Sequence, residues 1–186
     1  MLEELNLSHN ELEQLPDSVG KPQTLTKLNL SINRIKELPD SIGKLPVLQN
    51  FWLMDNDLEQ LPVAFGELSR LNVLLLNRNK LKDLPSSFGR LESLTYLDLS
   101  ENQIEKLPEW FSFLSALRKL DLTRNKLEDI SPINLLSTLE ILWISFKKFP
   151  HLEEALAQLQ KDLPNTNIRV IKELKRGEDA ASCVLS

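Results

Sequence analysis

The residues that could carry covalent or acid–base chemistry are few, and their spacing forms no catalytic constellation. The two histidines, His9 and His151, lie near opposite ends of the chain, which contains no G-x-S-x-G, P-loop, H-E-x-x-H or paired-cysteine spacing. Asp98 and Asp121 are expected on adjacent strands, where a solvated charged face is favoured over an acid pair. The sequence therefore predicts a protein that is not an enzyme and that uses no cofactor or metal ion.

The single cysteine stands fourth from the end, in Cys183-Val184-Leu185-Ser186. Two aliphatic residues before a terminal serine form a C-a-a-X box, similar to the tail of some Ras-type small GTPases. This resemblance implies that Cys183 is prenylated, and Ser186 favours a farnesyl group. One lipid gives only marginal membrane binding, so the association with a membrane is expected to be reversible. The alternative is a disordered tail with a coincidental ending.

Charge and composition restrict the partners and the compartment. The net charge is −5, with 22 basic and 27 acidic residues, which disfavours a nucleic-acid partner because that needs a basic face. No signal peptide is expected, since the repeat described below already includes Met1 to Glu4. One thiol suits a reducing compartment. The expected location is therefore the cytoplasm, with reversible association to the cytoplasmic face of a membrane.

A 23-residue repeat organises most of the chain and must position these residues. Leucines recur at 2, 25, 48, 71, 94 and 117, followed by Leu139 after 22 residues. Asparagines keep the same spacing at 10, 33, 56, 79, 102 and 125. A repeat of this length predicts a solenoid, in which each unit contacts only its neighbours.

The repeat reads L-x-x-L-x-L-x-x-N-x-L-x-x-L-P-x-x-x-G-x-L and resembles the leucine-rich repeat family over residues 2–152. Its Leu-Pro and later Gly resemble the intracellular class that includes Ras-binding scaffolds and Ras-suppressor proteins. The resemblance implies an α/β fold, a curved horseshoe with a parallel sheet on its concave side and short helical or irregular segments on its convex side. It also implies a protein partner, with a small GTPase or its regulators as a candidate.

Elementary physical chemistry gives each repeat position a role. Alternation in Leu28-Asn29-Leu30 predicts a half-buried strand, with the leucines inward and Asn29 and Ser31 outward. Asn33 can pair turn groups that would otherwise be buried and unpaired. Pro39 ends the extended segment, and residues 40–43 suit a helical turn. The aromatic residues at the Ile42 position are expected to be core wedges; they are Phe65, Phe88 and Phe111.

Three segments are expected along the chain. Residues 1–150 hold about six full repeats and one degenerate repeat. Residues 151–171 form a cap with a helix at 151–163 and a short strand at 168–171. Residues 172–186 form a flexible tail with the C-a-a-X box. The first strand, around Leu5 and Leu7, has no cap, so the chain is expected to be monomeric unless that edge pairs. A truncated chain and a cover for this edge both stay open.

The register predicts an apolar patch on the concave face. Trp52, Met54, Val73, Leu75 and Tyr96 point outward from three consecutive repeats, where exposed apolar residues indicate a binding surface. The alternative is that they pack on one another as inert neighbours.

A second patch contains Trp143 with Ile141 and Phe146, which the terminal helix could instead cover. The hypothesis is a non-enzymatic scaffold or adaptor that binds a protein partner on its concave face. The alternative function is a soluble regulatory or substrate-recognition subunit, of the phosphatase or ubiquitin ligase type, without a lipid.

Overall fold

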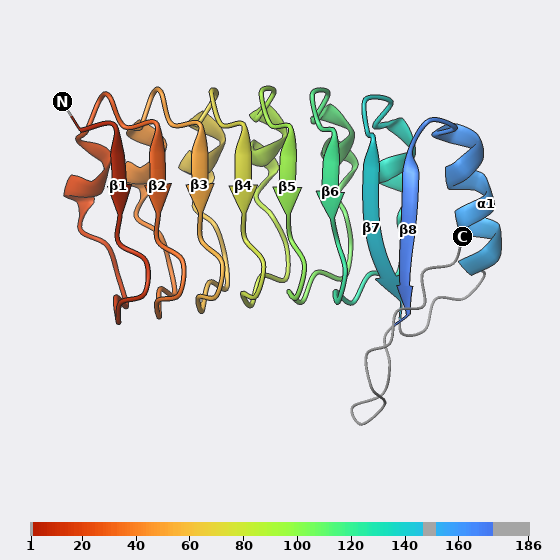
Figure 1. Cartoon of the computed structure of the whole chain (residues 1–186), viewed down its shortest axis with the longest axis horizontal. Coiled ribbons are helices and arrows are strands. Elements are labelled where there is room, and N and C mark those ends of the chain that lie inside the picture. The colour runs from red at the N-terminus through yellow and green to blue at the C-terminus, as the bar shows by residue number, and fades with distance from the viewer. Residues whose placement is uncertain (1, 147–151, 173–186) are drawn as a thin grey trace.

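The computed structural model describes residues 2–146 and 152–172, which form one sheet of eight parallel strands in chain order (Figure 1). The strands are β1 (Glu4–Asn6), β2 (Lys27–Asn29), β3 (Asn50–Trp52), β4 (Val73–Leu75), β5 (Tyr96–Asp98), β6 (Lys119–Asp121), β7 (Ile141–Phe146) and β8 (Asn167–Lys172). Short 3-10 helices alternate with them: η1 (Asp17–Gly20), η2 (Asp40–Lys44), η3 (Val63–Glu67), η4 (Ser86–Arg90), η5 (Glu109–Phe113) and η6 (Ser131–Leu135). The α-helix α1 (Leu152–Asp162) precedes β8. The predicted α/β repeat architecture is confirmed.

The prolines precede most of the 3-10 helices, and the inward leucines form the buried side of each strand. Pro39 adopts an extended conformation directly before η2, and prolines take the same place before η1, η3, η4 and η5. The strand leucines Leu28 and Leu30 are fully buried, as predicted. The 3-10 helices lie on one side of the sheet (Figure 1). We call this side the 3-10 face and the opposite side, which was predicted to be concave, the strand face.

A stack of aromatic rings runs through the core between the two faces. The ring centroids of Phe51 and Phe65 are 5.9 Å apart, and those of Phe65 and Phe88 are 5.8 Å apart, with nearly parallel planes. Phe65, Phe88 and Phe111 have no exposed surface, so their predicted role as core wedges is confirmed. The stack ties successive repeats together, because a ring in one repeat packs on the ring of the next.

The repeated asparagines form a buried ladder of hydrogen bonds. Asn79 Nδ2 donates to the carbonyl oxygens of Leu53 and Leu76 at 2.9 and 3.0 Å. Its Oδ1 accepts from the backbone N–H of Leu58 at 3.0 Å. Each ladder asparagine from 33 to 125 repeats these contacts across two repeats. The prediction that these asparagines are structural is therefore confirmed.

The third outward position was predicted wrongly in four of the seven repeats, whereas Ser8, Met54 and Asn77 at the same position are half-buried. Ser31 was expected to face solvent, but its exposed fraction is only 4%, and Ser100, Thr123 and Ser145 are buried as well. In three of these four repeats the next residue adopts a left-handed conformation, and the short side chain of serine or threonine stays close to the turned backbone. This row therefore belongs mostly to the turn and not to the exposed surface.

The end of the stack is closed by α1 and β8. Leu159 and Leu163 are buried, and β8 pairs in parallel with β7 over its six residues. The predicted cap helix is present, and the closing strand is longer than the predicted 168–171. The segment boundaries at 150 and 171 stay predictions. No helix among residues 2–146 and 152–172 is long and apolar enough to cross a membrane.

Candidate protein-binding surface

In-register pairing lines up equivalent residues of successive repeats across the strand face. The last residue of each of the first six strands and Trp143 of β7 form one row: Asn6, Asn29, Trp52, Leu75, Asp98, Asp121 and Trp143. Four of the seven are asparagine or aspartate. Trp52 and Leu75 interrupt this polar series on adjacent strands, as the sequence predicted.

The polar members of the row hydrogen-bond to their own turn. Asn29 Oδ1 accepts from the backbone N–H of Ser31 at 3.0 Å, and Asp98 Oδ1 accepts from that of Ser100 at 2.9 Å. Asn6 and Asp121 make the same contact. The indole of Trp52 and the isobutyl group of Leu75 have no acceptor oxygen. These two repeats therefore lack a local hydrogen bond that stabilises the turn in four others.

Three of the predicted residues line one shallow hollow on the strand face. Trp52, Met54 and Leu75 form its apolar wall, and its volume is about 300 Å³. The rest of the lining comes from the two preceding repeats: Ser8, His9, Asn29, Ser31 and Ile32. Val73 and Tyr96 pair with each other on the neighbouring row but do not line the hollow. All five predicted residues are half-buried, which leaves part of each side chain open to a partner.

Sequence reasoning missed Ile32. This residue has a φ of 57°, in the left-handed region, and its exposed fraction is 39%. A β-branched residue is unfavourable in that region by about 1–2 kcal/mol. The other described non-glycine residues with this conformation are His9, Asp55, Arg78, Glu101 and Arg124, which are all polar or charged. A comparison of the six full repeats could have found the exception, because Ile32 is the one apolar residue at this position among them.

Trp143 is not part of the hollow. Asp98 and Asp121 separate it from Leu75 along the row. The guanidinium of Arg169 on β8 lies over its indole, 5.7 Å from the ring centroid. The side chain of Phe146 and residue Cys183 lie outside the described part of the structure. The second predicted patch therefore remains a separate prediction.

A chain of ion pairs borders the strand face along the left-handed residues. Arg78 lies 3.5 Å from Asp55 and 3.2 Å from Glu101, and Arg124 lies 3.2 Å from the same Glu101 carboxylate. The hydrogen bond and charge of Glu101, followed by those of Asp55, raise the pKa of Arg78 above its ordinary value. Because these ion pairs are exposed, they contribute little to the stability of the fold, but they hold their side chains together along the border of the strand face.

Asp98 and Asp121 face the same side of the sheet without a cationic partner. Within residues 2–146 and 152–172, no lysine or arginine forms an ion pair with either carboxylate. Burial raises the pKa of Asp98, and the charges of Asp121 and Glu101 add to this effect. The described residues hold no group of three potential metal ligands, so this acid pair is not a recognisable metal centre.

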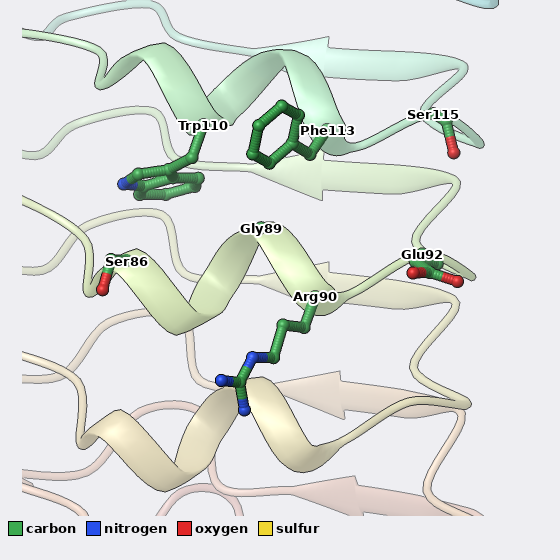
Figure 2. Close-up of a pocket in the computed structure, with 7 residues that line it drawn as sticks. All are labelled: Ser86, Gly89, Arg90, Glu92, Trp110, Phe113 and Ser115. Carbon is green, nitrogen blue, oxygen red and sulfur yellow. The ribbon is translucent and has the colours of Figure 1, made fainter.

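A second hollow lies on the 3-10 face between η4 and η5, with a volume of about 520 Å³ (Figure 2). Its lining residues are Ser86, Gly89, Arg90, Glu92, Trp110, Phe113 and Ser115. Figure 2 shows Trp110 and Phe113 on η5, next to the segment that carries Gly89, whereas Arg90 points away, toward Glu67 of the preceding repeat. Sequence reasoning missed this surface, although Phe113 stands where earlier repeats carry Lys44, Glu67 and Arg90.

Comparisons with known proteins agree with this geometry. A family model described as leucine rich repeat matches residues 1–58, 59–104 and 69–127. A solved leucine-rich repeat protein of Leptospira interrogans is similar, with a TM-score of 0.77 and 34% sequence identity over 90% of this chain. The chain spans 42% of the length of that protein.

Other comparisons limit what can be transferred to this chain. No curated protein sequence matches it. In all, 388 solved chains match, and a fold this common does not by itself select a partner. The matches support repeats of this type in general and do not single out the Ras-binding and Ras-suppressor class.

Proposed function

The chain belongs to the leucine-rich repeat family, and on this premise we propose that it is a protein-binding module whose partner docks on the strand face. The contact centres on the hollow formed by Trp52, Met54 and Leu75, with Ile32 at its edge. The matched family is a repeat module and not a catalytic family. Binding without catalysis is therefore the function that the described residues support best.

One observation carries this proposal: Trp52, Leu75 and Ile32 are apolar at positions where a polar residue would make the fold more stable. Trp52 and Leu75 replace residues that hydrogen-bond their own turn in four other repeats. Ile32 occupies a left-handed position that disfavours branched side chains. The Ser31 hydroxyl in the same hollow is buried without a partner among the described residues. Features that oppose folding and cluster at one surface are typical of a functional site.

Two double variants, each compared with the wild type, test the proposal. The full chain is immobilised and used to capture proteins from a lysate of its own cells. We expect Trp52→Ala with Leu75→Ala to lose the captured partner, because truncation of aromatic anchors usually removes much of the binding energy. The matched control is Val63→Ala with Phe113→Ala, which truncates two exposed apolar residues on the 3-10 face. Thermal unfolding followed by circular dichroism checks that each variant is folded.

The proposal is wrong if the folded strand-face variant retains the partner as well as the wild type does. Loss of the partner in the control variant alone would instead place the contact on the 3-10 face, at Val63 or Phe113. The two outcomes are distinguishable because the surfaces lie on opposite sides of the sheet (Figure 1).

A finer proposal concerns the membrane. The sequence Cys183-Val184-Leu185-Ser186 supports farnesylation of Cys183 and reversible attachment to the cytoplasmic face of a membrane. The test is metabolic labelling with a farnesyl precursor, comparing the wild type with Cys183→Ser. Equal and absent labelling in both would overturn the lipid anchor and favour a soluble regulatory or substrate-recognition subunit.

The finest proposal is that the partner is a small GTPase or one of its regulators. Its support is the resemblance of the Leu-Pro and Gly spacing to the Ras-binding class. Identification of the captured partner by mass spectrometry tests it, and a partner from an unrelated class of protein would overturn it.

A further inference from the structure

The acid pair and the apolar hollow lie side by side on one row of the strand face. Leu75 pairs in register with Asp98, and Asp98 pairs with Asp121. Adjacent strands in a sheet are about 4.8 Å apart, so the midpoint of Trp52 and Leu75 lies about 10 Å from the midpoint of the two aspartates. A ligand that runs across the strands along this row can therefore contact both features.

Among the described residues, the charged side chains near Asp98 and Asp121 supply no cationic partner for either carboxylate. The arginines at the border, Arg78 and Arg124, are already engaged with Asp55 and Glu101. Lys119 of β6 is exposed and forms no ion pair within the described residues. Like charges directly opposite on adjacent strands destabilise a sheet. A cation from outside would relieve the repulsion between Asp98 and Asp121.

We propose that the partner presents an extended segment with an apolar side chain for the hollow and a lysine or arginine for Asp98 and Asp121. This inference rests on the proposed function, because it gives the chemistry of the ligand for that same surface. In a polyproline II segment, residues three apart lie on the same side and about 9 Å apart, which matches the 10 Å separation. Residues two apart in a β-strand are only about 7 Å apart. The segment therefore carries its basic residue three positions from its apolar residue.

Charge complementarity distinguishes this occupant from an acidic or purely apolar one. An acidic segment would place a like charge beside two carboxylates, which opposes binding. A purely apolar segment would bury the Asp98 carboxylate further without giving it a cationic partner. A basic residue avoids both costs, and an arginine can also bind a carboxylate through two parallel hydrogen bonds.

The experiment uses a phage library of random twelve-residue peptides selected on the immobilised full chain. We expect the selected peptides to share an apolar residue with lysine or arginine three positions away. One selected peptide and its basic-residue→Gln analogue are then titrated against the wild type and against Asp98→Asn with Asp121→Asn. These asparagines keep the turn hydrogen bonds, as Asn6 and Asn29 do.

We expect the asparagine variant to bind the basic peptide about tenfold more weakly than the wild type does. The Gln analogue should bind to the asparagine variant and to the wild type with almost equal affinity. Peptides without a basic preference, or a basic peptide that both proteins bind equally, would overturn this inference. If such peptides bind the wild type but do not bind the variant with Trp52→Ala and Leu75→Ala, the proposed function still holds. If no recovered peptide depends on Trp52 and Leu75, the proposed surface and this inference both fail.

Discussion

Replacement of Asn79 by alanine tests whether the asparagine ladder holds the stack together. Asn79 lies in the middle of the ladder, and its side chain is buried. Alanine removes the bonds to the carbonyl oxygens of Leu53 and Leu76 and to the N–H of Leu58, all at 2.9–3.0 Å. At about 1 kcal/mol for each hydrogen bond, the loss is about 3 kcal/mol. Backbone groups left buried and unpaired raise it toward about 5 kcal/mol.

The matched control is Asn10→Ala at the first position of the same ladder. Asn10 is exposed, and its Nδ2 donates only within its own repeat, to Leu7 and Ser8. Its loss should cost less than about 1 kcal/mol, because water can replace these bonds. Asn79→Asp should cost more than alanine, since a carboxylate would face the two carbonyl oxygens of Leu53 and Leu76.

The assay is urea unfolding followed by far-ultraviolet circular dichroism. We expect a lower midpoint for Asn79→Ala with an unchanged dependence on urea concentration. In thermal unfolding, the melting temperature should fall by about 6–20 °C. A loss below 1 kcal/mol for Asn79→Ala, or an equal loss for Asn10→Ala, would refute the idea that buried ladder bonds stabilise the stack.

Three further predictions concern packing, protonation and strain. Gly66→Ala should destabilise the fold by about 2 kcal/mol or more, because the new Cβ would lie 2.2 Å from the backbone carbonyl oxygen of Ser87. Gly89→Ala should cost less than about 1 kcal/mol, because its Cβ would lie 3.3 Å from the backbone carbonyl oxygen of Trp110. Equal losses of stability in thermal unfolding would contradict this prediction. Burial raises the pKa of Asp98 above its ordinary 3.8, so the folded state binds this proton more tightly than the unfolded state, and the free energy of unfolding should fall as pH rises from about 3.8 through the raised value. In urea titrations between pH 3 and 6, the free energy of unfolding of Asp98→Asn should fall less with pH than that of the wild type. An unchanged pH dependence would argue against a raised pKa of Asp98. Ile32→Asn should increase the free energy of unfolding by about 1 kcal/mol, because asparagine tolerates a φ of 57°, and should weaken partner capture; a less stable variant would show that Ile32 is not strained.

The repeat made much of the fold predictable from the sequence. The leucines, the ladder asparagines and the phenylalanine wedges were assigned correctly, because each position must do the same work in every copy. The 3-10 helices followed from the prolines, although residues 40–43 extend to Lys44 in the structure. Ser31 was assigned wrongly, because strand alternation was extended one residue beyond the point where the backbone turns.

The candidate site was predictable only in part. Trp52, Met54 and Leu75 stood out because large apolar residues interrupt a polar series, and the structure brings them to one hollow. Ile32 was missed, because strand alternation says nothing about residues in the turn. Trp143 was named on the same grounds as the others, yet the position of Arg169 over its ring depends on β8 pairing with β7, which the repeat does not contain.

The sequence by itself determined which residues are neighbours across the sheet. Parallel strands in register place residues 23 apart side by side, so a fixed period gives the rows without coordinates. Only the tertiary structure decided what those neighbours do. The period places Arg78 between Asp55 and Glu101, each 23 residues away, and the distances of 3.5 and 3.2 Å show that its guanidinium forms ion pairs with both carboxylates. Among the described residues, no lysine or arginine lies close enough to pair with Asp98 or Asp121 beside the apolar hollow, and ion pairs depend on separations of a few ångströms that no repeat period specifies.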